Sequence, residues 1–133
     1  MFTLLFLLLF ARRSAPNQTA LHVIVQNVQV GKGTINVAIF NDKNDFLKKP
    51  VAAQIRKADS VTVEFSFPIA PGEYAIAAYQ DLNENQQLDA GLFHIPKEPY
   101  GFSNNYRPKM SAPKFEDCLI KVAGGDTSTI NLK

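Results

Sequence analysis

The stretch Val61-Thr-Val-Glu-Phe-Ser-Phe67 alternates strictly between apolar and polar side chains. Successive side chains of a β-strand point to opposite faces, so the two valines and two phenylalanines share one face. Thr62, Glu64 and Ser66 share the other face. The pattern predicts a strand with one face in a hydrophobic core and one face in water.

Similar patterns on both sides of this stretch predict further strands. Gly33 to Phe40 repeats the alternation, and Leu21 to Val30 is rich in valine at strand-like spacing. The glycines of Gly31-Lys-Gly33 indicate a hairpin turn, so we expect these two strands to pair antiparallel. Glu73 to Tyr79 has apolar side chains on both faces and predicts a central strand. We also expect strands at Ala52–Arg56, Phe115–Val122 and Thr127–Leu132, the last two joined through Gly124-Gly-Asp126.

About seven strands separated by turns, with no sustained helical spacing, indicate an all-β fold. The expected architecture is an antiparallel two-sheet sandwich of the immunoglobulin or prealbumin type with one long ordered loop. A chain of 133 residues that is 46% hydrophobic is long enough for one core. We therefore expect a single domain over residues 20–133.

The N-terminal segment Met1 to Phe10 is an apolar run. It is shorter than the roughly 20 residues that a membrane-spanning helix needs. The run predicts a signal peptide over residues 1–15, with cleavage as late as residue 20. Arg12-Arg13 follows the apolar run, whereas signal peptides carry basic residues before it. We expect an exported protein, periplasmic or extracellular, with no stable membrane span after signal removal.

The charge balance argues against nucleic acid as a partner. Removal of the first fifteen residues deletes two arginines, so the basic count falls from 14 to 12 and equals the 12 acidic residues. Nucleic-acid affinity comes mainly from an excess of Lys and Arg, which this chain lacks. The lone Cys118 cannot form an internal disulfide, and its apolar surroundings predict an inert buried thiol.

The segment from Gln80 to Lys114 shows almost no alternation and is dense in Asn, Asp, Pro, Gly and aromatic residues. A connection of this length in a compact domain is usually functional or disordered. Its aromatic side chains favour burial and therefore an ordered loop.

The first part of this loop has the ligand spacing of a calcium-binding loop. Oxygen-bearing side chains occur at relative positions one, three, five and nine, the spacing with which such a loop surrounds a hard cation. However, Gln86 replaces the glycine of position six, and Leu92 replaces the bidentate Glu of position twelve. Turn formation by Asp and Asn explains the same composition. The candidate Ca²⁺ ligands are Asp81, Asn83, Asn85, Asp89 and, through its backbone carbonyl, Gln87.

Three blocks of sequence resemble a bacterial family known as domain of unknown function 2141. They run from Pro71-Gly-Glu-Tyr-Ala to Asp89, from Ile95-Pro-Lys-Glu-Pro-Tyr-Gly-Phe-Ser-Asn-Asn105, and over Pro113-Lys-Phe115. The chain departs from the family pattern at Gln86, where the loop glycine is usual, and at Phe93-His94, which precede Ile95-Pro96 where a glycine is usual. The resemblance implies an exported β-sandwich-like domain and supplies no activity.

The leading hypothesis is a non-catalytic exported domain whose loop binds calcium or a partner such as an envelope protein or glycan. The candidate partner-binding residues are Phe93, Tyr100, Phe102 and Tyr106. An alternative is a hydrolase-like enzyme that uses His94 with Asp89 or Glu98. A third alternative, a purely structural envelope module, predicts that the rings of Phe93, Phe102 and Tyr106 are buried.

Overall fold

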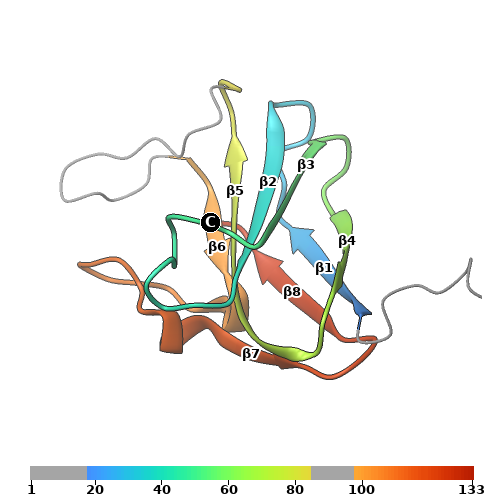
Figure 1. Ribbon diagram of the computed structural model, residues 1–133. Coiled ribbons are helices and arrows are strands. Elements are labelled where there is room, and N and C mark those ends of the chain that lie inside the picture. Colours follow the sequence, from blue (N-terminus) through green and yellow to red (C-terminus); the bar gives the residue numbers. More distant parts are fainter. Residues whose placement is uncertain (1–17, 85–97) are drawn as a thin grey trace, which may run out of the picture.

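The computed structural model describes residues 18–84 and 98–133, which form a sandwich of two β-sheets (Figure 1). The predicted signal segment lies outside the described residues. Within the described ranges, no helix has the length and apolar character needed to cross a bilayer. The all-β, two-sheet architecture predicted from the sequence is confirmed.

The smaller sheet has three strands in the order β4, β1, β8. β1 (Thr19–Gln26) lies in the centre, and β4 (Val63–Ile69) pairs with it antiparallel. β8 (Thr127–Asn131) pairs with the other edge of β1 in parallel. The expectation of a purely antiparallel sandwich was therefore wrong for this one pair, because β1 and β8 both enter the sheet from the same end.

The larger sheet has five strands around β5 (Gly72–Asp81). β2 (Thr34–Phe40) pairs with one edge of β5, and β3 (Ala52–Lys57) pairs with the far side of β2. The other edge of β5 is shared by two short strands. β7 (Leu119–Val122) pairs with its first residues, and β6 (Tyr100–Phe102) pairs with Ala77 to Tyr79. β5 is thus the central strand that the sequence predicted.

The main core lies between the two sheets. The inward side chains of β4 include Phe65 and Phe67, which are 2% and 1% exposed, and those of β1 and β2 alternate in the same way. Val61 is 57% exposed, because β4 begins only at Val63. The strict alternation of the sequence therefore identifies the inward faces of β2 and β4 correctly.

The predicted hairpin of β1 and β2 is wrong. Both edges of β1 are occupied by β4 and β8, so β2 pairs instead with β3 and β5 in the other sheet. The connection crosses between the sheets and is held by the buried side chain of Gln80, whose amide donates to the carbonyls of Gln29 and Lys32, each at 2.7 Å. Gly33 has a φ of +65°, and a Cβ there would lie 1.9 Å from the carbonyl oxygen of Asp81.

The C-terminal strands also differ from the prediction. Residues Phe115–Cys118 form a short 3₁₀ turn, η4, so β7 begins only at Leu119. The turn after β7 carries the chain from the larger sheet to β8 in the smaller one. The carboxylate of Asp126 accepts the N–H groups of Gly124 at 2.9 Å and Ala123 at 2.7 Å, and these hydrogen bonds lower its pKa.

A second apolar cluster lies on the outer face of the larger sheet. Phe46, in the series of turns between β2 and β3, packs edge-on against Phe40 at 5.4 Å and Phe115 at 5.8 Å between ring centroids. Ala75 and Cys118 are buried in the same cluster. The turns and η4 therefore cover part of this outer face.

Ser103 fastens β6 to its neighbours. It begins the short 3₁₀ turn η3 (Ser103–Asn105) and is fully buried. Its Oγ accepts the N–H of Ile76 in β5 at 2.9 Å and donates to the carbonyl of Cys118. One small hydroxyl therefore joins the central strand, η3 and the end of η4.

The next two residues extend this fastening to both sheets. The amide of Asn104 donates to the carbonyl of Leu119 in β7 at 3.0 Å. The side-chain oxygen of Asn105 accepts the N–H of Asn131 in β8 at 2.9 Å. Both asparagines have positive φ, a conformation that Asn tolerates better than most residues.

β6 also lies directly against β8. Tyr100 and Lys133 exchange two backbone hydrogen bonds, each 3.1 Å long. A Cβ on Gly101 would lie 2.5 Å from Cγ2 of Ile130 and 2.9 Å from the carbonyl oxygen of Asn131. Only a glycine allows this close approach, which closes one side of the sandwich.

The variant Ser103→Ala should be less stable than the wild type by about 1–3 kcal/mol, because the buried N–H of Ile76 loses its acceptor. Urea unfolding followed by circular dichroism measures the difference. The matched control is Ser111→Ala at an exposed position, expected to change the stability by less than about 0.5 kcal/mol. Equal stability of the two variants would contradict the role assigned to Ser103.

Candidate functional site

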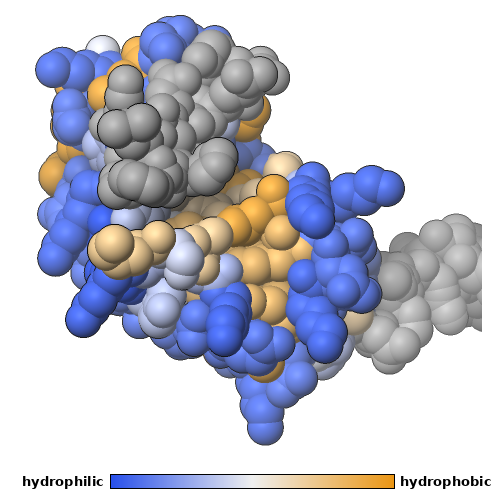
Figure 2. All heavy atoms as spheres, turned by 90° about the vertical axis from the view of Figure 1, so that its left-hand side faces the viewer, coloured by the Kyte–Doolittle hydropathy of each residue, from blue (hydrophilic) through white to orange (hydrophobic). Residues whose placement is uncertain are grey.

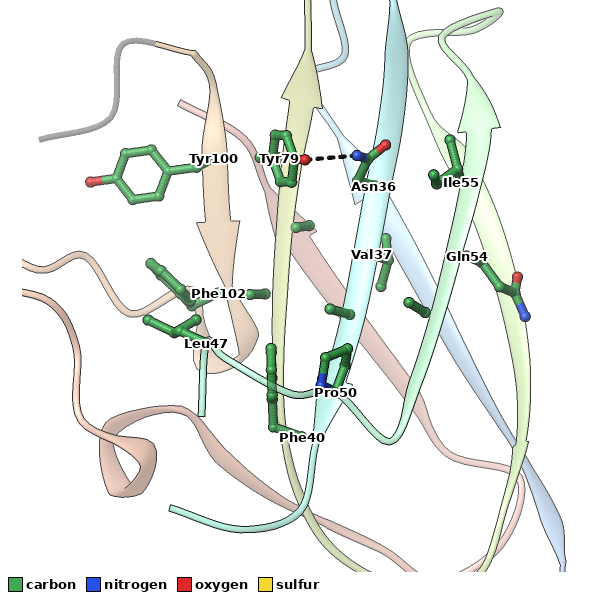
Figure 3. A pocket seen from close by; sticks show the side chains of 14 residues that line it. Asn36, Val37, Phe40, Leu47, Pro50, Gln54, Ile55, Tyr79, Tyr100 and Phe102 are labelled. Carbon is green, nitrogen blue, oxygen red and sulfur yellow. Dashed lines mark hydrogen bonds between the residues drawn. The ribbon is translucent and has the colours of Figure 1, made fainter. Parts of the chain in front are cut away.

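An apolar groove lies beside the second cluster on the outer face of the larger sheet and shares Phe40 and Phe102 with it (Figure 3). Its volume is about 440 Å³. Figure 2 shows, on this side of the molecule, apolar residues gathered together with hydrophilic residues along their border. The lining residues come from β2, β3, β5, β6 and the turns between β2 and β3.

The register of the strands explains the shape of the groove. Ala38 in β2 lies opposite Ala53 in β3 and Ala77 in β5, and Ala77 lies opposite Phe102 in β6. Neighbouring strands are only about 4.8 Å apart, so the three alanines form a continuous low floor that crosses the strands. One wall follows the adjacent row of side chains, which consists of Ile55, Asn36, Tyr79 and Tyr100. The opposite wall contains Phe40, Leu47 and Pro50 (Figure 3).

The polar groups of the first wall bind one another. Nδ2 of Asn36 donates to the hydroxyl oxygen of Tyr79 at 2.8 Å (Figure 3), and its Oδ1 accepts the hydroxyl of Thr34 at 3.2 Å. A ligand that enters the groove therefore covers polar atoms that already have partners. Such a surface favours apolar ligands, because little hydrogen bonding to water is lost.

The edge strand β3 has its largest apolar residue, Ile55, on the outside, whereas Ala52 packs against the main core. The amide of Gln54 turns toward the smaller sheet and donates to the carbonyl of Ser66 in β4 at 2.7 Å. The guanidinium of Arg56 lies 5.7 Å from the ring centroid of Phe65 on the same side. Ile55, by contrast, faces outward and is 53% exposed. An outer sheet face is usually polar, so this inversion indicates that the face has something to cover it.

The candidate partner-binding aromatics are divided between two places. Tyr100 and Phe102 both line the groove, where Tyr100 is half-buried and Phe102 is 6% exposed. The guanidinium of Arg107 lies 4.2 Å from the ring centroid of Tyr100. Tyr106 is half-buried against the second apolar cluster, and Phe93 lies outside the described residues. The proposed set of four therefore does not form one exposed patch in the described part of the chain.

The structure describes two of the five candidate calcium ligands. Asp81 is fully buried, and Asn83 is exposed. Asn85, Gln87 and Asp89 lie outside the described residues. Over residues 18–84 and 98–133, no three or more His, Cys, Asp or Glu side chains form a group that could hold a metal ion.

A second buried carboxylate lies at the base of the same loop. Glu98 is 6% exposed, and its Oε2 accepts the N–H of Leu82 at 2.8 Å. The N–H of Gln80 also donates to the carbonyl of Pro99 at 2.9 Å. The two ends of the loop are thus fastened together beside Asp81 and Glu98.

The residues of the hydrolase-like alternative are mostly outside the described chain. His94 and Asp89 lie outside the described residues. The carboxylate of Glu98 accepts the backbone N–H of Leu82. Ser103 and Cys118 are both fully buried. The hydroxyl of Ser103 accepts the N–H of Ile76 and donates to the carbonyl of Cys118. Burial raises the pKa of the Cys118 thiol to about 12, with a further contribution from Asp117, so the thiol is protonated at neutral pH.

Sequence reasoning missed the alanine floor of the groove. Ala75 and Ala77 were recognised as an apolar second face of β5, and the prediction was that this face is buried. Ala75 is indeed fully buried, whereas Ala77 and Tyr79 are half-buried and line the groove. The outward alanines of three strands were the available signal, but only the strand register shows that they lie side by side.

Residues 23–130 match a bacterial family described as "Uncharacterized protein conserved in bacteria (DUF2141)". No curated protein and no solved structure matches the chain.

Cys118 should react with a thiol reagent such as iodoacetamide far more slowly in the native protein than in urea. The thiol is fully buried and its pKa is raised, and both effects suppress formation of the reactive thiolate. Mass spectrometry after timed labelling at about pH 8 measures the two rates. Comparable labelling rates in the native protein and in urea would contradict the prediction that Cys118 is an inert thiol.

Proposed function

We propose that this chain, which belongs to the bacterial family DUF2141, is a non-catalytic exported binding domain that takes a small apolar ligand in its groove. Family membership agrees with the sequence motifs and supplies no activity. The observation that carries the proposal is the apolar groove that the described residues leave open on the outer face of the larger sheet. The apolar run Met1 to Phe10 supports export.

The size of the groove favours a small ligand over a protein. Pockets for small molecules typically measure about 300–1,000 Å³, and the groove holds about 440 Å³. A stable protein interface generally buries more than about 1,000 Å². Apolar surface in water is unfavourable by about 25 cal/mol for each Å², so a slim apolar ligand that covers the alanine floor gains free energy.

The chemistry of the described residues favours binding over catalysis. Ser103 and Cys118 are engaged in the core and out of reach of a substrate in the groove. The lining residues offer hydrocarbon, aromatic and paired amide groups. Such groups position a ligand, and the described lining residues include no histidine, carboxylate, lysine or cysteine that could serve as a general acid or base.

A bulky side chain on the groove floor should abolish binding of a neutral apolar probe. N-phenyl-1-naphthylamine, which fluoresces in apolar surroundings, should bind the wild type saturably. Ala53→Trp and Ala77→Trp should each weaken binding at least about tenfold, because the indole fills the trough. Fluorescence titration gives the affinities, and circular dichroism checks folding.

The matched control is Thr129→Trp, which adds the same indole at an exposed position in β8 of the smaller sheet. It should leave probe affinity unchanged. Absence of saturable binding to the wild type, or equal binding by all three variants, would disprove the groove as a ligand site.

Calcium binding by the Asp81 to Asp89 loop is a second candidate function. It is favoured by the two buried carboxylates, Asp81 and Glu98, at the base of the loop. The site lacks a full set of ligands by sequence, so its dissociation constant should lie at the weak extracellular end, about 10⁻⁴ to 10⁻³ M.

Calcium at about 10 mM should then stabilise the protein by about 1.4–2.7 kcal/mol. Thermal unfolding in EDTA, in calcium and in magnesium measures the effect. Asp89→Asn should remove it, and Asp59→Asn, an exposed acid outside the loop, should not. A wild-type melting temperature that is the same in EDTA and in calcium would rule the site out.

A further inference from the structure

The segment that borders the groove carries a concentrated positive charge. Residues 43–57, which span the turns and β3, contain five basic side chains and one acidic side chain. The chain from residue 18 to 133 has 12 of each, so the remainder is correspondingly negative. The basic residues are Lys43, Lys48, Lys49, Arg56 and Lys57, and the acidic one is Asp45.

Three of these lysines stand beside lining residues. Lys48 and Lys49 lie between Leu47 and Pro50, which both line the groove. Lys57 follows Ile55 by two residues and therefore shares the outer face of β3. All three side chains are exposed. β3 is the edge strand of the larger sheet, so Lys48 and Lys49 lie before this edge strand and Lys57 lies at its end.

The interior of the groove differs from its border. None of the described residues that line it carries a charge. Its polar wall is internally hydrogen-bonded through Asn36 and Tyr79. An uncharged trough with a cationic mouth matches a molecule that has an apolar body and an anionic end.

Two other occupants fit less well. A strand from another protein would have to add to β3, but Gln54 and Arg56 turn inward from this strand, and an inward charge protects an edge against such pairing. A second copy packed symmetrically on this face would bring two positively charged borders together. The inward side chains of the edge strand disfavour the added strand, and the charge distribution disfavours the second copy.

We infer that the ligand of the groove is an anionic amphiphile, a single hydrocarbon chain that ends in an acidic group such as a carboxylate. This inference rests on the proposed function. The chain lies across the strands on the floor of Ala53, Ala38 and Ala77. The acidic end lies at the β3 edge, within the positive border that Lys48 and Lys49 form before the strand and Lys57 forms at its end.

Displacement of bound N-phenyl-1-naphthylamine by amphiphiles of equal chain length tests the inference. Laurate, dodecanol and dodecyltrimethylammonium are compared below their critical micelle concentrations. Laurate should displace the probe at a concentration at least about tenfold lower than either of the others. Raising the salt concentration from about 0.05 M to about 0.5 M should weaken the binding of laurate and leave the binding of dodecanol unchanged.

Charge reversal shows whether the lysines at the groove are responsible. The triple variant K48E/K49E/K57E should lose the preference for laurate. The matched triple variant K32E/K109E/K121E changes the net charge equally at exposed positions outside residues 43–57, and it should retain the preference. Binding of the neutral probe should be the same in both.

The outcomes separate the two proposals. If the probe binds but the three amphiphiles displace it equally, or if the two triple variants behave alike, the anionic ligand is refuted and the apolar groove remains. Failure of the probe to bind refutes the groove itself. A stable dimer in sedimentation that Ala53→Trp dissociates, without displacement by any amphiphile, would identify the face as an interface between copies and overturn the inference.

Discussion

The buried hydroxyl of Ser103 holds β6 against the central strand by accepting the N–H of Ile76 and donating to the carbonyl of Cys118. The two asparagines that follow continue the connection to β7 and β8, which belong to different sheets. These bonds add to the pairing of β6, a strand of only three residues, with β5 and to its backbone bonds with Lys133. The groove depends on them, because Tyr100 and Phe102 of β6 form its end.

The hydrogen bonds of Ser103, Asn104 and Asn105 also explain why these residues occur in the motif that carries the family resemblance. The segment Tyr100-Gly-Phe-Ser-Asn-Asn105 carries much of the family resemblance, and four of its six residues serve the fold directly. Gly101 permits contact with β8, and the Ser-Asn-Asn run supplies hydrogen bonds to four elements, β5, η4, β7 and β8. The remaining two, Tyr100 and Phe102, face the groove. Residues that serve the fold and residues that line the groove therefore share one short stretch.

The groove arises because β5 is apolar on two faces. Its inward face, with Ile76 and Ala78, packs in the main core, and its outward face needs a second cover. Phe46 and η4 supply this cover over Ala75, where the second cluster lies. Over Ala77 and Tyr79 the described residues leave the face open. The positive charge of residues 43–57 borders this open part. An apolar floor and a cationic edge thus come from neighbouring segments.

Alternation and composition act over a few neighbouring residues, so they were enough to predict the all-β class, the inward faces of β2 and β4 and the burial of Cys118. The loop predicted from Gln80 to Lys114 was wrong at two places, because Gln80 and Asp81 end β5 and Tyr100–Phe102 forms β6. The tertiary structure alone decided that β1 and β2 lie in different sheets and that β8 pairs with β1 in parallel. It alone aligned Ala53, Ala38 and Ala77 into one floor. Strand partners are chosen by contacts between segments far apart in the chain, and no local pattern specifies which edge or which face remains free.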